Sequence, residues 1–195
     1  KYDPFNYPAF LASPTEFVTG VTDVVTGRPV YFGKQPLMAD QCRLLRASAA
    51  IPLFSPMVEF RGRLYLDGGT ADPIPVKRAL ADGCDKVLVV LTQHREYVKS
   101  PTGQPSFYRR AFRDYPQMIR VLDERHTLYN DTRAWLWELE KTGKAVVVAP
   151  SAPLTVSRFE KRRSRLDEAY FLGKRDVLLS WDALRPFLSS HLPAE

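Results

Sequence analysis

The segment that most constrains how this chain folds lies at residues 46–75, RASAAIPLFSPMVEFRGRLYLDGGTADPIP. It holds two short strand-like segments, 57–60 and 63–66, around Arg61-Gly62, a pattern that predicts a β-hairpin. Asp67 follows the second run, and Gly68 and Gly69 follow Asp67. Because glycine lets a backbone approach a neighbouring group closely, this turn suits a loop that presents a carboxylate at a reaction centre.

The other patterns of the first half predict strands and helices in alternation. The expected elements are strands at 16–23 and 29–33, a helix at 41–49 capped by Asp40, a helix at 75–81 and a strand at 86–92. The last of these, KVLVVLT, is continuously apolar, which is typical of a strand buried on both faces in a parallel sheet. A helix followed by such a strand predicts a layered α/β architecture.

The second half has a more helical pattern. After a loop at 94–104, the sequence predicts helices at 106–114, 116–142, 157–172 and 176–188, with a strand at 145–149. No internal repeat and no low-complexity tract is present.

The order R-A-S-A-A-I-P, hairpin, L-D-G-G and proline-rich return to a helix resembles the aspartate half of a patatin-like phospholipase domain. The second half resembles the tail of a bacterial subgroup of that family. The resemblance implies a three-layer α/β/α sandwich with a mostly parallel central sheet, of which this chain is the C-terminal part. It also implies that residues 1–95 form the C-terminal half of the hydrolase domain, and that residues 96–195 form a mainly helical extension packed on it.

The resemblance further implies a serine–aspartate dyad without histidine. Asp67 matches the dyad aspartate, and Gly68 and Gly69 match the glycines of the motif loop. The family's nucleophile stands in a G-x-S-x-G elbow after a glycine-rich oxyanion loop, but no serine of this chain stands in that frame. We therefore expect a lipid acyl hydrolase or esterase completed by an N-terminal segment of the same protein, and a chain that is inactive alone. No cofactor is expected.

Other interpretations of these residues are open. Asp-Gly is a common turn dipeptide, so Asp67 could be a turn residue only. Ser48 is expected to pack in a helix rather than act as the nucleophile, and Asp72 to fix the loop rather than act as a second base. The histidines, His94, His126 and His191, show no metal-ligand spacing, so no metal site is expected.

The formal net charge of +6 is concentrated in two clusters, of which the smaller comprises Arg109, Arg110 and Arg113. The larger cluster comprises Arg158, Lys161, Arg162, Arg163 and Arg165. Such clusters are either solvated helix faces or surfaces that attract anionic lipid headgroups. Aromatic residues do not interleave with them, so nucleic acid is not an expected partner. The alternative to a hydrolase is thus a non-enzymatic patatin-like module that binds lipid or a partner.

Cellular location can be inferred from the cysteines and the apolar runs. No apolar run reaches the roughly 18 residues that a membrane span needs, and the N-terminal residues are not a signal peptide. Cys42 and Cys84 are expected to be buried, reduced thiols, which suits a reducing compartment. We expect a cytoplasmic protein that could bind a membrane peripherally.

Overall fold

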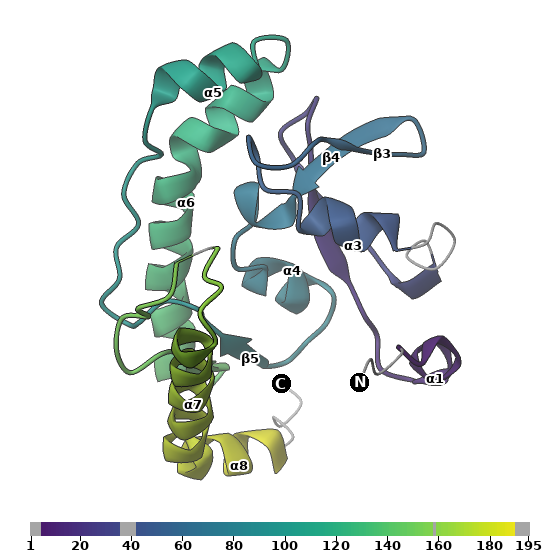
Figure 1. The fold of residues 1–195 in the computed structure, drawn as a ribbon. Coiled ribbons are helices and arrows are strands. Elements are labelled where there is room, and N and C mark those ends of the chain that lie inside the picture. Colours follow the sequence, from purple (N-terminus) through teal and green to yellow (C-terminus); the bar gives the residue numbers. More distant parts are fainter. Residues whose placement is uncertain (1–4, 36–41, 158, 190–195) are drawn as a thin grey trace. The chain divides into compact units, whose positions relative to one another are not determined.

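The computed structural model describes residues 5–35, 42–157 and 159–189, which form a mixed α/β structure (Figure 1). The chain divides into two compact units, residues 1–74 with 100–129 and residues 75–99 with 130–195. Helix α6 (Pro116–Lys141) confirms the long helix expected at 116–142, and it contributes residues to both units. The units therefore follow a different boundary from the sequence division after residue 95.

The first unit contains a four-stranded antiparallel sheet. Its strand order is β2 (Pro29–Phe32), β1 (Thr19–Asp23), β4 (Arg63–Asp67), β3 (Val58–Phe60). Both predicted hairpins are confirmed, although β1 begins at Thr19 rather than at residue 16. Arg61 and Gly62 both have positive φ, as the two-residue turn between β3 and β4 requires.

Helices cover this sheet with apolar side chains. Helix α3 (Arg43–Ser48) contributes Leu44, and α6 contributes Met118 and Leu122, to a cluster that includes Val21 and Leu66 of the sheet. The short helices α1 (Tyr7–Ala12) and α5 (Pro105–Ala111) belong to the same unit. The predicted helix cap Asp40 and the first residue of that helix, Gln41, lie outside the described residues.

Asp23 at the end of β1 holds the turn between β1 and β2. Its fully buried carboxylate accepts hydrogen bonds from the Thr26 backbone N–H (2.8 Å), from Thr26 Oγ1 (2.9 Å) and from Arg63 Nε (2.7 Å). Burial alone would raise the pKa of Asp23, but the hydrogen bonds from Thr26 and Arg63 outweigh it and hold the pKa below the usual value. The ionised form of Asp23 therefore stabilises the fold.

We expect Asp23→Asn to lower the free energy of unfolding by about 1–3 kcal/mol at pH 7, because charged hydrogen bonds are lost from a buried group. A carboxyl with a lowered folded-state pKa stabilises above its unfolded pKa of about 3.9, and that contribution is lost as the pH falls through the folded pKa. Urea unfolding at pH 7 and at about pH 3 should thus show a difference that shrinks in acid. Equal stability of the two proteins at pH 7 would contradict this role; Asp114→Asn, at an exposed carboxylate, is the control.

The second unit contains the parallel pair β5 (Val87–Val90) and β6 (Ala145–Val148), with helix α4 (Val76–Ala81) beside β5. The prediction of a mostly parallel sheet holds only for this pair within the described residues. The physical reason is connectivity: strands joined by a tight turn must run antiparallel, whereas β5 and β6 are separated by α6, which allows a parallel crossover.

Strand β5 is not buried on both faces, which corrects the expectation for residues 86–92. Val87 and Val89 are less than 10% exposed, whereas Leu88 is 43% and Val90 is 70% exposed. The alternation of side chains along a strand places these pairs on opposite faces, and the described part of the chain covers only one face.

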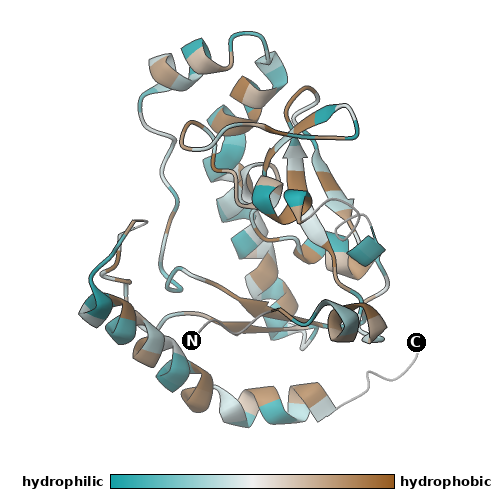
Figure 2. Ribbon diagram, turned by 45° about the vertical axis from the view of Figure 1, so that its right-hand side comes forward, coloured by the Kyte–Doolittle hydropathy of each residue, from teal (hydrophilic) through white to brown (hydrophobic). Residues whose placement is uncertain are grey.

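The last two helices have different bounds from those predicted. Helix α7 (Arg163–Leu179) begins after residue 157, and α8 (Trp181–Ser189) follows it. Gly173 does not interrupt α7. The helix ends at Leu179, and its C-cap residue Ser180 donates from its hydroxyl to the Asp176 carbonyl oxygen at 2.8 Å. Figure 2 shows apolar residues toward the end of α7, where Leu178 and Leu179 are more than 60% exposed.

Both cysteines are free thiols, as expected, but they are not both buried. Cys42 is half-buried, whereas Cys84, in the loop before β5, is exposed, so the prediction of two buried thiols is wrong for Cys84. Loops run over the surface, and a thiol placed in one is not enclosed by packing. No helix in the described ranges is both long enough and apolar enough to cross a bilayer.

Candidate active site

The backbone of Asp67 is fixed by two segments that are distant in the sequence. The Asp67 N–H donates to the Ala50 carbonyl oxygen at 2.9 Å, so the R-A-S-A-A segment lies against the end of β4. The Thr22 hydroxyl of β1 donates to the Asp67 carbonyl oxygen at 2.8 Å, and Thr22 is fully buried. Asp67 is thus attached both to the neighbouring strand and to the segment that follows α3.

The carboxylate of Asp67 is oriented by its own turn. Its Oδ1 accepts a hydrogen bond from the Gly69 N–H at 2.8 Å, at the start of the 3₁₀ turn η1 (Gly68–Thr70). Asp67 is half-buried, and among the described residues no donor contacts its other carboxylate oxygen, Oδ2. One oxygen is therefore held while the other is open to a reacting group, an arrangement suited to a general base.

Close approach of backbones explains why Gly68 is glycine. A Cβ atom on Gly68 would lie 2.3 Å from the carbonyl oxygen of Gly20 in β1. On Gly69 it would lie 3.3 Å from Asp67 Oδ1. Positive φ is not the reason, since the positive-φ glycines in the described part of the chain are others. The first glycine lets β1 and the turn meet, and the second leaves room for the carboxylate.

Three further contacts hold the turn. The sequence predicted that Asp72 fixes this loop, but it did not predict any of the three contacts. The Ala71 N–H donates to Thr22 Oγ1 at 3.1 Å, and the Tyr31 hydroxyl donates to the carboxylate of Asp72. Arg125 of α6 donates from Nε to the Gly69 carbonyl oxygen at 3.0 Å. No local signal marks Thr22, Tyr31 or Arg125, because each is more than 40 residues away from its partner in the turn.

Among the described residues, no hydrogen bond joins Ser48, His94 or His126 to Asp67. Ser48 is the last residue of α3. His94 follows β5 and contacts Glu96, at 3.1 Å between Nδ1 and Oε2. His126 lies in α6, and His191 lies outside the described residues. The described ranges contain no group of three or more side chains that could hold a metal ion.

The larger basic cluster is partly neutralised. Arg158 lies outside the described residues. Arg162 and Arg165 both pair with Glu160, at 3.2 and 3.5 Å, and Arg163 lies 3.6 Å from Asp167. The side chain of Glu160 is only 8% exposed, whereas both members of the Arg163–Asp167 pair are exposed. An exposed pair is individually weak, so Arg163 can exchange its partner for another anion at little cost.

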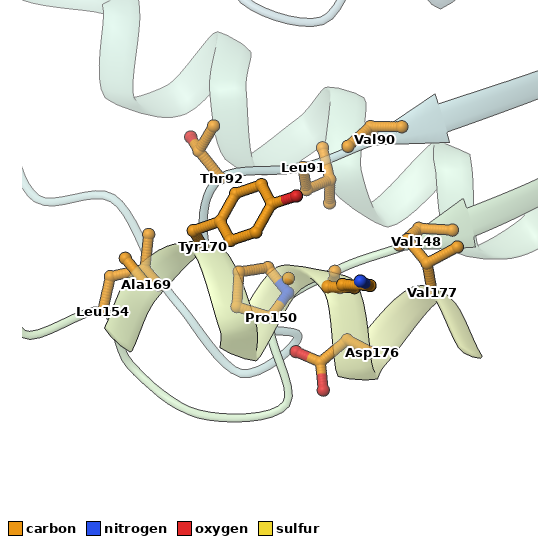
Figure 3. A pocket seen from close by; sticks show the side chains of 13 residues that line it. Val90, Leu91, Thr92, Val148, Pro150, Leu154, Ala169, Tyr170, Asp176 and Val177 are labelled. Atoms are coloured by element: carbon orange, nitrogen blue, oxygen red, sulfur yellow. The ribbon is translucent and has the colours of Figure 1, made fainter. Parts of the chain in front are cut away.

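The second unit contains an apolar cavity of about 420 Å³ at the carboxyl ends of β5 and β6. In Figure 3, Tyr170 and Val177 of α7 face Leu91 and Val148, which follow or end the two strands. Its volume is typical of small-molecule sites. The described residues that line it include no serine, cysteine or histidine. The cavity can therefore hold an apolar group, but its lining does not supply a nucleophile with a base.

Comparison with known proteins assigns the segment that carries Asp67. The sequence model described as "Patatin-like phospholipase" matches residues 7–80. The "Uncharacterized NTE family protein Rv1063c" of Mycobacterium tuberculosis (strain ATCC 25618 / H37Rv) is 31% identical over 93 residues, which are 48% of this chain and 25% of that protein. Residues 7–80 are therefore similar to the patatin-like phospholipase family. The patatin-like segment thus contains β1 to β4, the turn and all of α4 except its last residue.

A later part of the chain matches a second family. Residues 115–189 match a family described as "Domain of unknown function (DUF6363)". The "Uncharacterized protein YjjU" of Escherichia coli (strain K12) is 27% identical over 152 residues, which are 75% of this chain and 41% of that protein. The chain therefore spans less than half the length of the curated relatives it matches.

Proposed function

We propose that the complete protein is a serine hydrolase of lipid acyl esters, and that Asp67 is the base of a serine–aspartate dyad. The patatin-like segment supports a lipid hydrolase in general terms. The observation that carries the specific assignment is the geometry of the turn, in which Oδ1 of Asp67 is held by the Gly69 N–H and Oδ2 has no donor among the described residues. A carboxylate held in this way is pre-oriented for proton transfer.

In the proposed reaction, Asp67 transfers a proton both when the acyl-serine forms and when it is hydrolysed. As the serine hydroxyl oxygen bonds to the acyl carbon, its proton passes to the Asp67 carboxylate, and the carbonyl oxygen takes the negative charge. Backbone N–H groups outside this chain would stabilise that oxyanion. When the tetrahedral intermediate collapses, the bond to the leaving alcohol breaks and the proton moves from Asp67 to the alcohol. Water then attacks the acyl-serine by the same route, releasing the carboxylic acid and restoring the serine.

The nucleophile and the oxyanion donors are proposed to come from a preceding segment of the same protein. No serine of this chain stands in a G-x-S-x-G frame. The chain alone should therefore not hydrolyse esters. In the complete protein we propose the three-layer α/β/α sandwich, with residues 1–95 as the second half of its hydrolase domain and residues 96–195 as the helical extension.

A second candidate function is a patatin-like module that binds lipid without hydrolysing it. Exposed apolar side chains on α7 and α8 favour it, among them Phe171 (62%), Leu179 (73%) and Trp181 (50%). Lys161 and Arg163, also exposed, lie at or near the start of α7 and could meet anionic headgroups. A cytoplasmic protein that binds membranes peripherally would fit either function.

Labelling with a fluorophosphonate separates these two functions. We expect the complete native protein to be modified on one serine that lies outside these 195 residues, identified by mass spectrometry of the labelled peptide. Modification of Ser48 would overturn the assignment of the site. Complete protein that hydrolyses no ester and accepts no label would favour the binding module instead.

A further inference from the structure

Arg125 lies on the segment matched to the domain of unknown function, yet it contacts the turn that carries Asp67. Its Nε donates to the Gly69 carbonyl oxygen at 3.0 Å, across 56 residues of sequence. The patatin-like match ends at residue 80, and residues 115–189 match the other family. Both partners of this hydrogen bond nevertheless belong to the first compact unit.

Core packing fixes where Arg125 lies. Met118 is fully buried and Leu122 is 3% exposed, and both belong to the cluster that contains Val21 and Leu66 of the sheet. Residues spaced by three or four positions lie on one face of a helix, so Arg125 continues the face formed by Met118 and Leu122. Burial of Met118 and Leu122 therefore places Arg125 on the face of α6 that packs against the sheet.

A second close contact ties α6 to the sheet. A Cβ on Gly27, in the turn between β1 and β2, would lie 2.9 Å from the carbonyl oxygen of Gln117 and 2.9 Å from a methyl carbon of Val121. The backbone of the turn therefore lies directly against the beginning of α6, and the distance from α6 to β1 is set by packing rather than by Arg125 itself.

Gly69 is the residue through which Arg125 can act on Asp67. The Gly69 N–H orients Oδ1 of Asp67, and the Gly69 carbonyl oxygen accepts from Arg125. Two other carbonyl oxygens of the turn also accept hydrogen bonds, that of Asp67 from the Thr22 hydroxyl and that of Gly68 from the Ala71 and Asp72 N–H groups. Without Arg125, Gly69 would keep its wide conformational freedom, and the donor that holds the carboxylate would no longer be fixed.

We propose that Arg125 is a positioning residue for Asp67, so that the first part of the domain of unknown function completes the reaction centre of the patatin-like unit. The charged guanidinium fixes Gly69, and Gly69 fixes the carboxylate. This inference rests on the proposed dyad. Arg125 thus acts on Asp67 through Gly69.

The test uses the complete protein with Arg125→Ala, Arg125→Lys and Arg120→Ala. Arg120 is a matched control, since it lies on the same helix, its side chain is 70% exposed, and it pairs with Glu124. We expect Arg125→Ala to lower kcat for a soluble ester by tenfold or more with little change in KM, because a small displacement of a catalytic group slows the reaction strongly. Arg125→Lys should restore part of kcat, and Arg120→Ala should leave it unchanged.

Hydrogen exchange of residues 64–72 gives a measurement that does not depend on catalysis. Faster exchange there in Arg125→Ala, but not in Arg120→Ala, is expected. Unchanged kcat and unchanged hydrogen exchange in Arg125→Ala would overturn the inference about Arg125. The proposed dyad would still stand in that case, provided that Asp67→Asn is inactive. Full activity of Asp67→Asn would instead overturn the proposed function. If Arg125→Ala does not fold, the kcat and exchange of Arg125→Lys against wild type decide.

Discussion

Replacing Asp67 by asparagine should reduce ester hydrolysis by the complete protein by about 10²–10⁴-fold, which is the usual contribution of a positioned general base. Asparagine keeps an oxygen that can accept from the Gly69 N–H, so the turn should survive. Its amide cannot take the serine proton at neutral pH. The measurement is kcat on a soluble acyl ester, together with the melting temperature.

Two comparisons make this result decisive. Asp114→Asn changes an exposed carboxylate, 77% accessible at its side chain, in the same compact unit and should leave kcat unchanged. The melting temperature of Asp67→Asn should stay close to that of the wild type, since its hydrogen bond in the turn is retained. Turnover within a factor of a few of the wild type in Asp67→Asn would remove Asp67 from the dyad.

Adding a single methyl group at Gly68 is expected to be the most destabilising change in the turn. The new Cβ would lie 2.3 Å from the Gly20 carbonyl oxygen and 2.5 Å from its carbon, both backbone atoms that cannot rotate away. Strand β1 would have to separate from the end of β4, where Val21 is the register partner of Asp67. Gly68→Ala should therefore lower the free energy of unfolding by about 3 kcal/mol or more, at or beyond the upper range for overpacked sites.

The neighbouring glycine provides the control. In Gly69→Ala the new Cβ would meet Asp67 Oδ1 at 3.3 Å, and that side-chain atom can shift by a few tenths of an ångström. We expect Gly69→Ala to cost little stability but to lower kcat, because it displaces the carboxylate. Urea unfolding and kcat of both variants check this. Comparable stability of Gly68→Ala and wild type would show that the approach of β1 to the turn is not as close as described.

Local patterns in the sequence identified the parts of the site that are contiguous. The two short segments 57–60 and 63–66 around Arg61-Gly62 predicted the hairpin of β3 and β4, which is confirmed. The motif Asp67-Gly68-Gly69 lies directly at the end of that hairpin in the sequence. Hairpins and turns are determined by neighbouring residues, so sequence alone can locate them.

The burial of each side chain was harder to predict from the sequence than the positions of the helices and strands. The strand predicted at 86–92 was expected to be buried on both faces, but Val90 is 70% exposed. An apolar run shows that a strand can be buried, whereas the number of covered faces depends on which other segments pack there. The sequence likewise predicted separate helices at 157–172 and 176–188, whereas α7 runs without a break from Arg163 to Leu179.

The amino-acid sequence by itself determined the turn that presents Asp67 and the family resemblance, since both depend on residues adjacent in the chain. Only the tertiary structure revealed that Thr22, 45 residues from Asp67, and Arg125, 56 residues from Gly69, hold that turn. It also explained Gly68 by the approach of Gly20. These contacts arise from the packing of β1 and α6 against β4, and no periodicity or spacing in a sequence encodes which distant backbones will meet.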